Sequence, residues 1–119
     1  MPSKAEATTY RDTREDRVQI QFRLGEALVA KVDAAAEVEQ CTRNDWLVEA
    51  CTMKLAGKGQ PGAFLASEVT AGRIPILFRV GKKIKKAIDK DWQGKRISSR
   101  TMWIVEAILA RLSNYEFSH

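Results

Sequence analysis

An alternating segment occurs twice in the chain, and it constrains the fold more than any other feature. Residues 17–24 are RVQIQFRL, and residues 73–80, found 56 positions later, are RIPILFRV. In the first copy apolar residues alternate with Gln19, Gln21 and Arg23, a period of two that predicts a strand with one buried and one exposed face. A single strand has no ladder partner, so the two copies are expected to pair with each other, antiparallel.

Each predicted strand is followed by two segments of helical periodicity, in which apolar residues recur every three or four positions. We predict helices at Gly25–Glu39, Thr42–Leu55, Lys82–Trp92 and Ser99–Ser113. The second helices share WLVEA (residues 46–50) and WIVEA (residues 103–107) at an offset of 57, so the repeat extends over strand and helices. Thr42 and Ser99 precede these motifs as N-cap residues.

These patterns predict a single domain, residues 17–113. The chain divides into a flexible N-terminal arm (1–16), two repeats (17–55 and 73–113) joined by a glycine-rich linker (56–72), and a C-terminal tail (114–119). A repeat of about 40 residues is near the lower size limit for a stable core. We therefore expect the two repeats to form one pseudo-twofold intramolecular dimer, mainly α-helical with a short two-stranded antiparallel β-ribbon.

Composition supports a globular protein and gives no sign of a membrane segment. The 119 residues are 45% apolar and 29% charged, which is ordinary for a globular domain. No apolar run is long enough to cross a bilayer, and the polar N-terminus does not resemble a secretory signal. We predict a cytoplasmic protein.

Residue types suited to catalysis or metal binding are scarce. The one histidine is His119, at the last position, so neither a His-based catalytic group nor a metal cluster can be assembled. Cys41 and Cys51 would lie roughly 15 Å apart in one helix, beyond disulfide reach, and are predicted to be core thiols. Glu49 and Glu106 fit surface or ion-pairing positions. We predict no enzyme activity, no metal and no cofactor.

Charge and the polar strand face point to nucleic acid. The net charge is +5, and residues 61–119 hold 11 basic and 5 acidic side chains against 9 and 10 in residues 1–60, which favours a polyanionic partner. Glutamine can bond adenine, and arginine can bond guanine, at two points in the major groove. We therefore predict base contacts by Gln19, Gln21 and Arg23. The simpler alternative is that these side chains only form a solvated strand face.

The order strand, helix, helix, with a polar strand face and the helix start S/T-R-x-x-W-[LI]-x-E-A, resembles the ribbon-helix-helix family of the MetJ and Arc repressors. Ordinary members are homodimers of one unit, whereas this chain carries both units, in a TraY-like tandem arrangement. The resemblance implies that exposed strand residues enter the DNA major groove and that the second helix of each unit binds a phosphate at its N-terminus.

Carried over residue by residue, the resemblance implies specific contacts. The implied base-reading residues are Gln19, Gln21, Arg23, Leu77 and Arg79. The implied phosphate-binding residues are Thr42, Arg43, Asn44, Ser99, Arg100 and Thr101. Pro75 cannot donate to a ladder, so it is expected at the strand start or with its nitrogen facing away from the partner strand.

We therefore predict a sequence-specific DNA-binding protein, most simply a transcriptional repressor, with double-stranded DNA as its partner and no membrane association. Two alternatives stay open. One is an accessory protein of plasmid transfer or partition, which also binds DNA. The other is an antitoxin-like or anti-repressor module that binds a protein partner, which Pro75 and Leu77 favour slightly. Self-association of chains on DNA also stays open.

Overall fold

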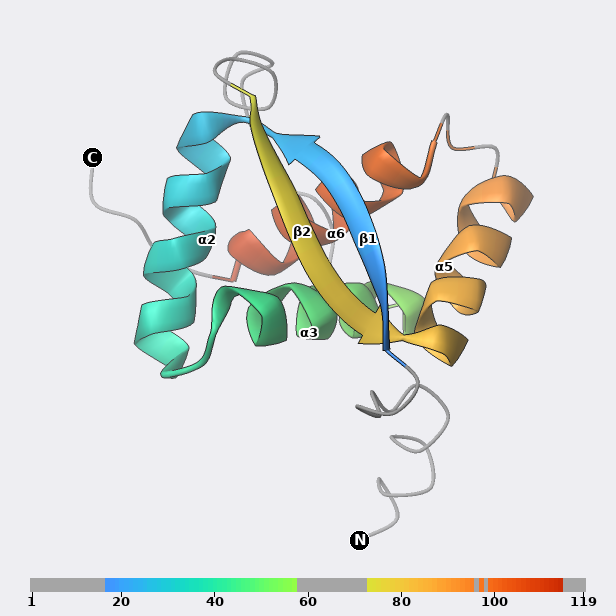
Figure 1. Cartoon of the computed structure of the whole chain (residues 1–119), viewed down its shortest axis with the longest axis horizontal. Coiled ribbons are helices and arrows are strands. Elements are labelled where there is room, and N and C mark those ends of the chain that lie inside the picture. Colours follow the sequence, from blue (N-terminus) through green and yellow to red (C-terminus); the bar gives the residue numbers. More distant parts are fainter. Residues whose placement is uncertain (1–16, 58–72, 96, 98, 115–119) are drawn as a thin grey trace, which may run out of the picture.

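The computed structural model describes residues 17–57, 73–95, 97 and 99–114. Figure 1 shows a two-stranded ribbon in front of a layer of helices. The predicted arm, most of the predicted linker and most of the predicted tail lie outside the described residues.

The ribbon consists of strands β1 (Arg17–Leu24) and β2 (Ile74–Gly81), which pair antiparallel. The antiparallel pairing is as predicted, and the register places Gln21 opposite Leu77 at the centre. Buried and exposed side chains alternate along both strands, so the expected buried face is confirmed. The second strand lies one residue later than predicted, because Gly81 still pairs with Arg17.

The helices are α2 (Glu26–Glu39), α3 (Arg43–Leu55), α5 (Lys82–Gly94) and α6 (Arg100–Leu112). They agree with the predicted ranges to within about two residues, which is the usual scatter at helix ends. The break predicted after Glu39 is confirmed, since Gln40 takes a left-handed conformation with φ 58°. Helix α5 extends to Gly94, two residues beyond its predicted end, and the Lys95 amide still donates to the carbonyl of Asp91 at 3.0 Å.

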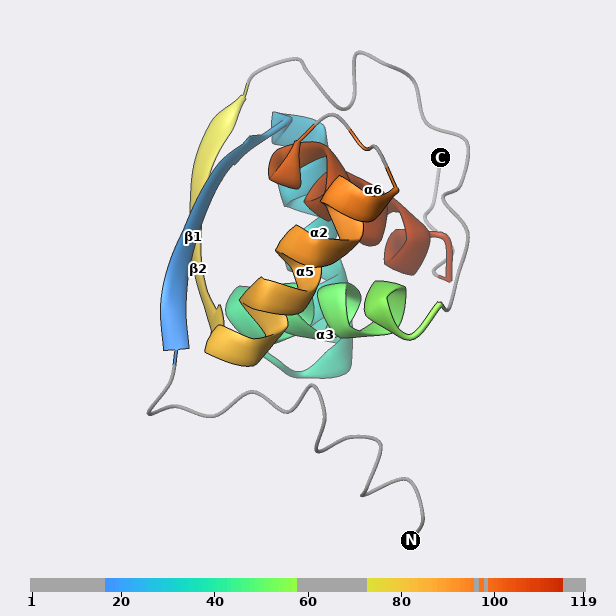
Figure 2. The same ribbon diagram turned by 90° about the vertical axis from the view of Figure 1, so that its right-hand side faces the viewer.

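The molecule has two layers. Figure 2, turned by 90° from Figure 1, shows the ribbon along one side and the helices packed against one of its faces. Every second residue of each strand points to the ribbon's inner face, and these residues are apolar. On this face the rings of Phe22 on β1 and Phe78 on β2 pack edge to face, with centroids 5.8 Å apart. The outer face of the ribbon is not covered by any of the four helices.

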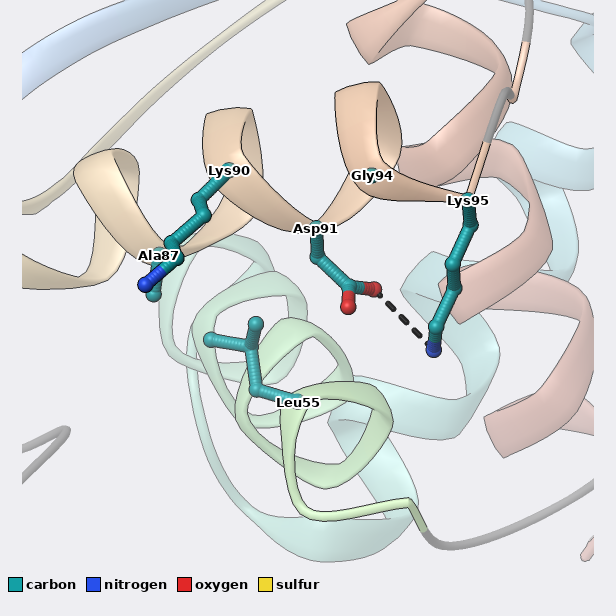
Figure 3. Close-up of a pocket in the computed structure, with 6 residues that line it drawn as sticks. All are labelled: Leu55, Ala87, Lys90, Asp91, Gly94 and Lys95. Carbon is teal, nitrogen blue, oxygen red and sulfur yellow. Dashed lines mark ion pairs between the residues drawn. The ribbon is translucent and has the colours of Figure 1, made fainter.

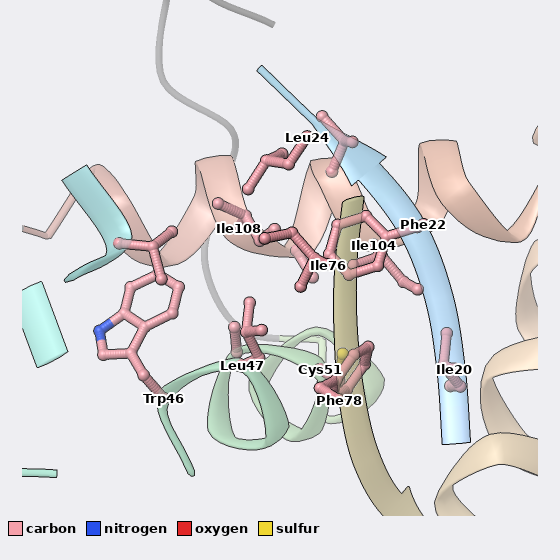
Figure 4. Packing of buried hydrophobic residues seen from close by; sticks show 14 of the residues in the cluster. Ile20, Phe22, Leu24, Trp46, Leu47, Cys51, Ile76, Phe78, Ile104 and Ile108 are labelled. Atoms are coloured by element: carbon pink, nitrogen blue, oxygen red, sulfur yellow. The ribbon is translucent and has the colours of Figure 1, made fainter. Parts of the chain in front are cut away.

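The core lies between the ribbon and the helices. In Figure 4, strand residues including Phe22 and Phe78 point toward Leu47 and Cys51 of α3 and Ile104 of α6. The apolar stripes predicted for the four helices are buried, apart from half-buried Leu55 and Ala87. The described residues include no buried polar or charged residue, so burial of apolar surface dominates the packing.

The two cysteines are free thiols, and their surroundings differ. Cys51 lies in the core, where burial raises the pKa of its thiol to about 12. Cys41 precedes α3 and is only half-buried against the core. The prediction of a core thiol is thus confirmed for Cys51 and holds in part for Cys41.

Helices α3 and α6 contact each other through two tryptophans that are completely buried, Trp46 and Trp103. The Lys54 ammonium of α3 lies 5.4 Å from the ring centroid of Trp103. The reciprocal contact is made by the Arg111 guanidinium of α6, which lies 4.7 Å from the ring centroid of Trp46 and donates to the Trp46 carbonyl at 2.7 Å. Lys54 also pairs with Glu106 of α6 at 3.2 Å. Each helix therefore supplies the cation that covers the other helix's indole.

Candidate nucleic-acid interface

The outer face of the ribbon presents three cross-strand pairs: Gln19 with Arg79, Gln21 with Leu77, and Arg23 with Pro75. All six of these residues are exposed. The structure therefore brings the five predicted base-reading residues together on one open surface, the face turned toward the viewer in Figure 1.

The two arginines of this face lie toward opposite ends of the ribbon. Arg23 is two residues from Gln21 on β1, and Arg79 is two residues from Leu77 on β2, in the opposite direction. Their backbones are separated by roughly 14 Å along the ribbon at about 3.4 Å per residue. Within the described parts of the chain, neither guanidinium has a hydrogen-bond or ion-pair partner. Both are thus available to an incoming ligand.

Asn44 binds the edge of β2 that faces away from β1. The backbone amide of Arg79 donates to Asn44 Oδ1 at 2.7 Å, and Asn44 Nδ2 donates to the Arg79 carbonyl at 3.0 Å. Asn44 therefore binds the strand that carries Arg79, and its amide group is already engaged there. Thr101, at the matching position of α6, makes no comparable bond to Arg23 among the described residues.

The bonds of Asn44 also locate the nitrogen of Pro75. Backbone groups in an antiparallel pair alternate, residue by residue, between facing the partner strand and facing away. Because the amide of Arg79 faces away from β1, toward Asn44, the alternation also turns the nitrogen of Pro75 away from β1. Pro75 is the second residue of β2 and costs the ladder no hydrogen bond, as predicted.

The second helices of the two repeats begin with hydroxyl caps. Thr42 Oγ1 accepts a hydrogen bond from the Asp45 amide at 3.0 Å, and Ser99 Oγ accepts one from the Met102 amide at 3.1 Å. Both hydroxyls therefore have a structural role that requires no phosphate. Other amides of each first turn lack an intrahelical acceptor, as at any helix N-terminus.

Arg43 and Arg100, at the first position of these helices, each form an ion pair with an aspartate of the preceding helix. Arg43 donates from Nε and Nη2 to the two carboxylate oxygens of Asp33, at 2.7 and 2.8 Å. Arg100 Nε donates to Asp89 Oδ1 at 2.8 Å. Sequence reasoning missed these partners, although the signal was present: the aspartates are 56 positions apart and the arginines 57.

These ion pairs change the chemistry of the expected phosphate sites. The hydrogen bond from Arg43 holds the pKa of Asp33 below its usual value, against a smaller opposing effect of desolvation. At Asp89, desolvation by burial is outweighed by hydrogen bonds from Arg100, Trp92 and Lys85, so its pKa is also lowered. Both aspartates are thus ionised near neutral pH. A phosphate at either helix start would have to share the arginine with a carboxylate.

The neutral variant Asp89→Asn is expected to lower the free energy of unfolding near neutral pH by about 1–2 kcal/mol. Because the folded-state pKa of Asp89 is depressed, its contribution is present above the unfolded-state pKa of about 3.9 and is lost as the pH falls through the folded-state pKa. Urea unfolding of both proteins near pH 7 and at about pH 2 measures this. A difference of the same size at both pH values would contradict the assignment.

A pocket of about 420 Å³ lies between the last turn of α3 and the second half of α5. Figure 3 shows its lining residues, Leu55, Ala87, Lys90, Asp91, Gly94 and Lys95. The Asp91 carboxylate pairs with Lys95 at 3.2 Å and accepts the Trp103 indole N–H at 2.7 Å. The Asp91 carboxylate of the pocket is thus engaged in structural contacts. No ribbon residue contributes to the pocket.

Three other features bear on the class of site. The residues that the structure describes contain no group of three or more His, Cys, Asp or Glu side chains arranged to hold a metal ion. Of the expected carboxylate positions, Glu49 is exposed and Glu106 pairs with Lys54. None of the four described helices is long and apolar enough to cross a membrane.

Comparison of the chain with family models, with curated proteins and with solved structures finds no match.

Proposed function

We propose that this protein binds double-stranded DNA sequence-specifically by inserting the β1–β2 ribbon into the major groove, most simply as a transcriptional repressor. The observation that carries the proposal is the outer ribbon face. Two arginines without a partner among the described residues lie at its opposite ends, Gln21 lies between them, and Gln19 lies beside Arg79. The major groove admits a two-stranded ribbon, and each arginine can bond a guanine edge there. The helices cover the other face and support the ribbon.

We also propose that the fold is a tandem ribbon-helix-helix arrangement in which the repeats 17–55 and 73–113 are related by a pseudo-twofold axis. Three contacts support this. The strands of the two repeats pair with each other. The aspartate–arginine pair occurs once within each repeat. The cation–indole contact occurs once in each direction between α3 and α6. A pair of equivalent units is expected to produce such duplicated and reciprocal contacts.

A salt titration with arginine variants tests DNA binding. Arg43→Ala and Arg100→Ala are each expected to reduce the slope of log K against log salt by about 0.9, the effect of losing one phosphate contact. Both variants should weaken binding to selected and random duplexes alike, since backbone contacts carry no sequence information. Fluorescence anisotropy at several salt concentrations measures the slope.

The matched control for Arg43→Ala is Asp33→Asn, which keeps the arginine and removes its carboxylate partner. It should strengthen binding to both duplexes, because the guanidinium at the start of α3 is then no longer shared. A changed sequence preference with an unchanged salt slope would assign Arg43 to base recognition instead. If the parent protein binds no duplex even at low salt, the proposed function is wrong.

The preferred DNA site is expected to be asymmetric at its centre. Arg23 and Arg79 can each meet a guanine, roughly four base-pair steps apart at about 3.4 Å per step. Between them, Gln21 can bond an adenine edge, whereas Leu77 offers only apolar contact, best suited to a thymine methyl. Selection of bound duplexes from a random pool should return guanines at both ends and unequal central positions. Recovery of perfect palindromes under one ribbon would refute this.

A second candidate function is binding of a protein partner through the same ribbon face. The observation in its favour is Leu77, which is 52% exposed at the centre of that face, next to exposed Pro75 on β2. An exposed large apolar side chain between polar neighbours is common at protein interfaces. Absence of duplex binding in the salt titration above, with a folded protein, would favour this candidate.

A further inference from the structure

One surface of α5 carries an unusual charge. Four of the five lysines of α5, Lys82, Lys83, Lys86 and Lys90, are exposed on this surface, and within the described residues none of the four has an ion-pair partner. The two aspartates of α5 cannot neutralise them, because both are engaged elsewhere: Asp89 binds Lys85 and Arg100, and Asp91 binds Lys95 and the Trp103 indole. We call these four residues the α5 lysine face.

The matching helix of the first repeat lacks this surface. At the offset of 56, the positions of the α5 lysine face correspond to Glu26, Ala27, Ala30 and Ala34 of α2, all of which are exposed. At the positions where α5 carries four positive charges, α2 thus carries one negative charge and three methyl groups. The two flanks of the ribbon therefore differ in charge.

Stability of the folded chain does not account for this arrangement. Lys82 and Lys83 lie in the first turn of α5, which contains no acidic residue, so they are close to the positive end of the helix dipole. Lys82 and Lys86, and Lys86 and Lys90, are like charges four residues apart, which also opposes helix formation. A polyanion bound at this surface would relieve both sources of repulsion.

The position of α5 indicates which polyanion fits. The helix follows β2 directly, so Lys82 and Lys83 lie at the end of the ribbon where Arg79 is found. Helix α2 follows β1 directly, at the opposite end, near Arg23, and Figure 1 shows the two helices on opposite flanks of the ribbon. In Figure 2, α5 begins beside the ribbon and runs away from it. A duplex held on the ribbon would thus extend past the start of α5.

We infer that the α5 lysine face binds the phosphate backbone of duplex DNA just outside the base pairs covered by the ribbon, at the Arg79 end alone. This inference rests on the proposed function and extends it, because the contact would be made on one flank of the site and so orient the protein on the duplex. Lys82, Lys83 and Lys86 are nearest to the ribbon and carry the contact.

The test compares two variants of the full chain that change the net charge equally. The near variant, Lys82→Gln with Lys83→Gln and Lys86→Gln, removes three positive charges beside the ribbon. The far variant, Gln93→Glu with Lys95→Glu, makes the same change in net charge at the exposed end of α5 that lies away from the ribbon. The probe is a duplex selected from a random pool by the parent protein.

The near variant is expected to bind the duplex at least about 10-fold more weakly at low salt and to reduce the salt slope by about two to three units, at roughly 0.9 per phosphate. Its melting temperature should equal or exceed that of the parent, because the repulsion within α5 is relieved. The far variant should bind nearly as the parent does. Both should keep the parent's sequence preference.

Other results would overturn the inference. Equal losses in the near and far variants would mean that net charge alone matters. A near variant with unchanged affinity and slope, while Arg23→Ala still weakens binding, would remove the α5 contact and leave the proposed function intact. If the parent protein binds no duplex, the proposed function and this inference fail together.

Discussion

The double variant Arg23→Ala with Arg79→Ala is expected to lose most of its preference for a selected duplex over a random one. Each arginine is proposed to bond a guanine at two points, worth about 1–3 kcal/mol of discrimination when well placed. Loss of both would cost about 2–6 kcal/mol, a factor of roughly 30 to 10⁴ in the specificity ratio. Competition of labelled selected duplex with unlabelled random duplex measures this ratio.

The single variants locate the two contacts. Arg23→Ala should relax the preference at one end of the site and Arg79→Ala at the other, because the register puts them at opposite ends of the ribbon. Each side chain points outward and has no partner among the described residues, so its loss should leave the melting temperature nearly unchanged. Preserved specificity in the double variant would show that the two arginines do not recognise bases.

Asn44→Ala is a further control on the proposed contact of Arg79 with DNA. It removes the two hydrogen bonds that hold the Arg79 backbone while leaving the arginine side chain in place. The variant should therefore weaken the preference at the Arg79 end less than Arg79→Ala does. An effect at the Arg23 end instead would conflict with the position of Asn44 beside β2.

The sequence was sufficient to predict the elements of the fold because their signals are local. The alternation in β1 and the stripe on α6 are contained within single segments, and the caps at Thr42 and Ser99 depend on a hydroxyl and an amide three residues later. The antiparallel pairing of the strands followed from the recurrence of one alternating segment, and the structure supplied the register that pairs Gln21 with Leu77. The exposed face followed from the same alternation.

The contacts between elements could not be predicted in the same way. Asn44 was expected to face a phosphate, but its side chain bonds the backbone of Arg79, 35 residues away, because α3 packs beside the strand of the other repeat. Arg43 and Arg100 were expected to bind phosphate, and the aspartate that the packing of consecutive helices brings to each was not foreseen. Such partners depend on helix crossing, which periodicity does not specify, and only the matching offsets of the charges pointed to them.

Trp103→Ala is expected to destabilise the chain by about 3–5 kcal/mol, the usual cost of removing a large aromatic from a core. The Trp103 side chain is fully buried, its indole N–H donates to Asp91, and the Lys54 ammonium lies over its ring. A domain of this size has a free energy of unfolding of about 5–15 kcal/mol, so the loss would be a substantial part of the total stability. Urea unfolding followed by circular dichroism measures the loss.

Trp92→Ala is the matched control, because Trp92 is half-buried and makes one indole hydrogen bond to Asp89. Its loss should be clearly smaller than that of Trp103→Ala, since less apolar surface returns to water. Equal losses in the two variants would mean that the α3–α6 contact is not the centre of the core.

Trp46→Ala should have about the same effect as Trp103→Ala, although it lies in the other repeat. Each indole is covered by a cation from the opposite helix, Arg111 over Trp46 and Lys54 over Trp103, so neither repeat completes its own core. Both variants should therefore unfold in a single transition, coincident by circular dichroism and by fluorescence of the remaining tryptophans. The midpoint should not depend on protein concentration, because both repeats belong to one chain. Two separate transitions, or a midpoint that rises with concentration, would show that the repeats fold apart or require a second chain.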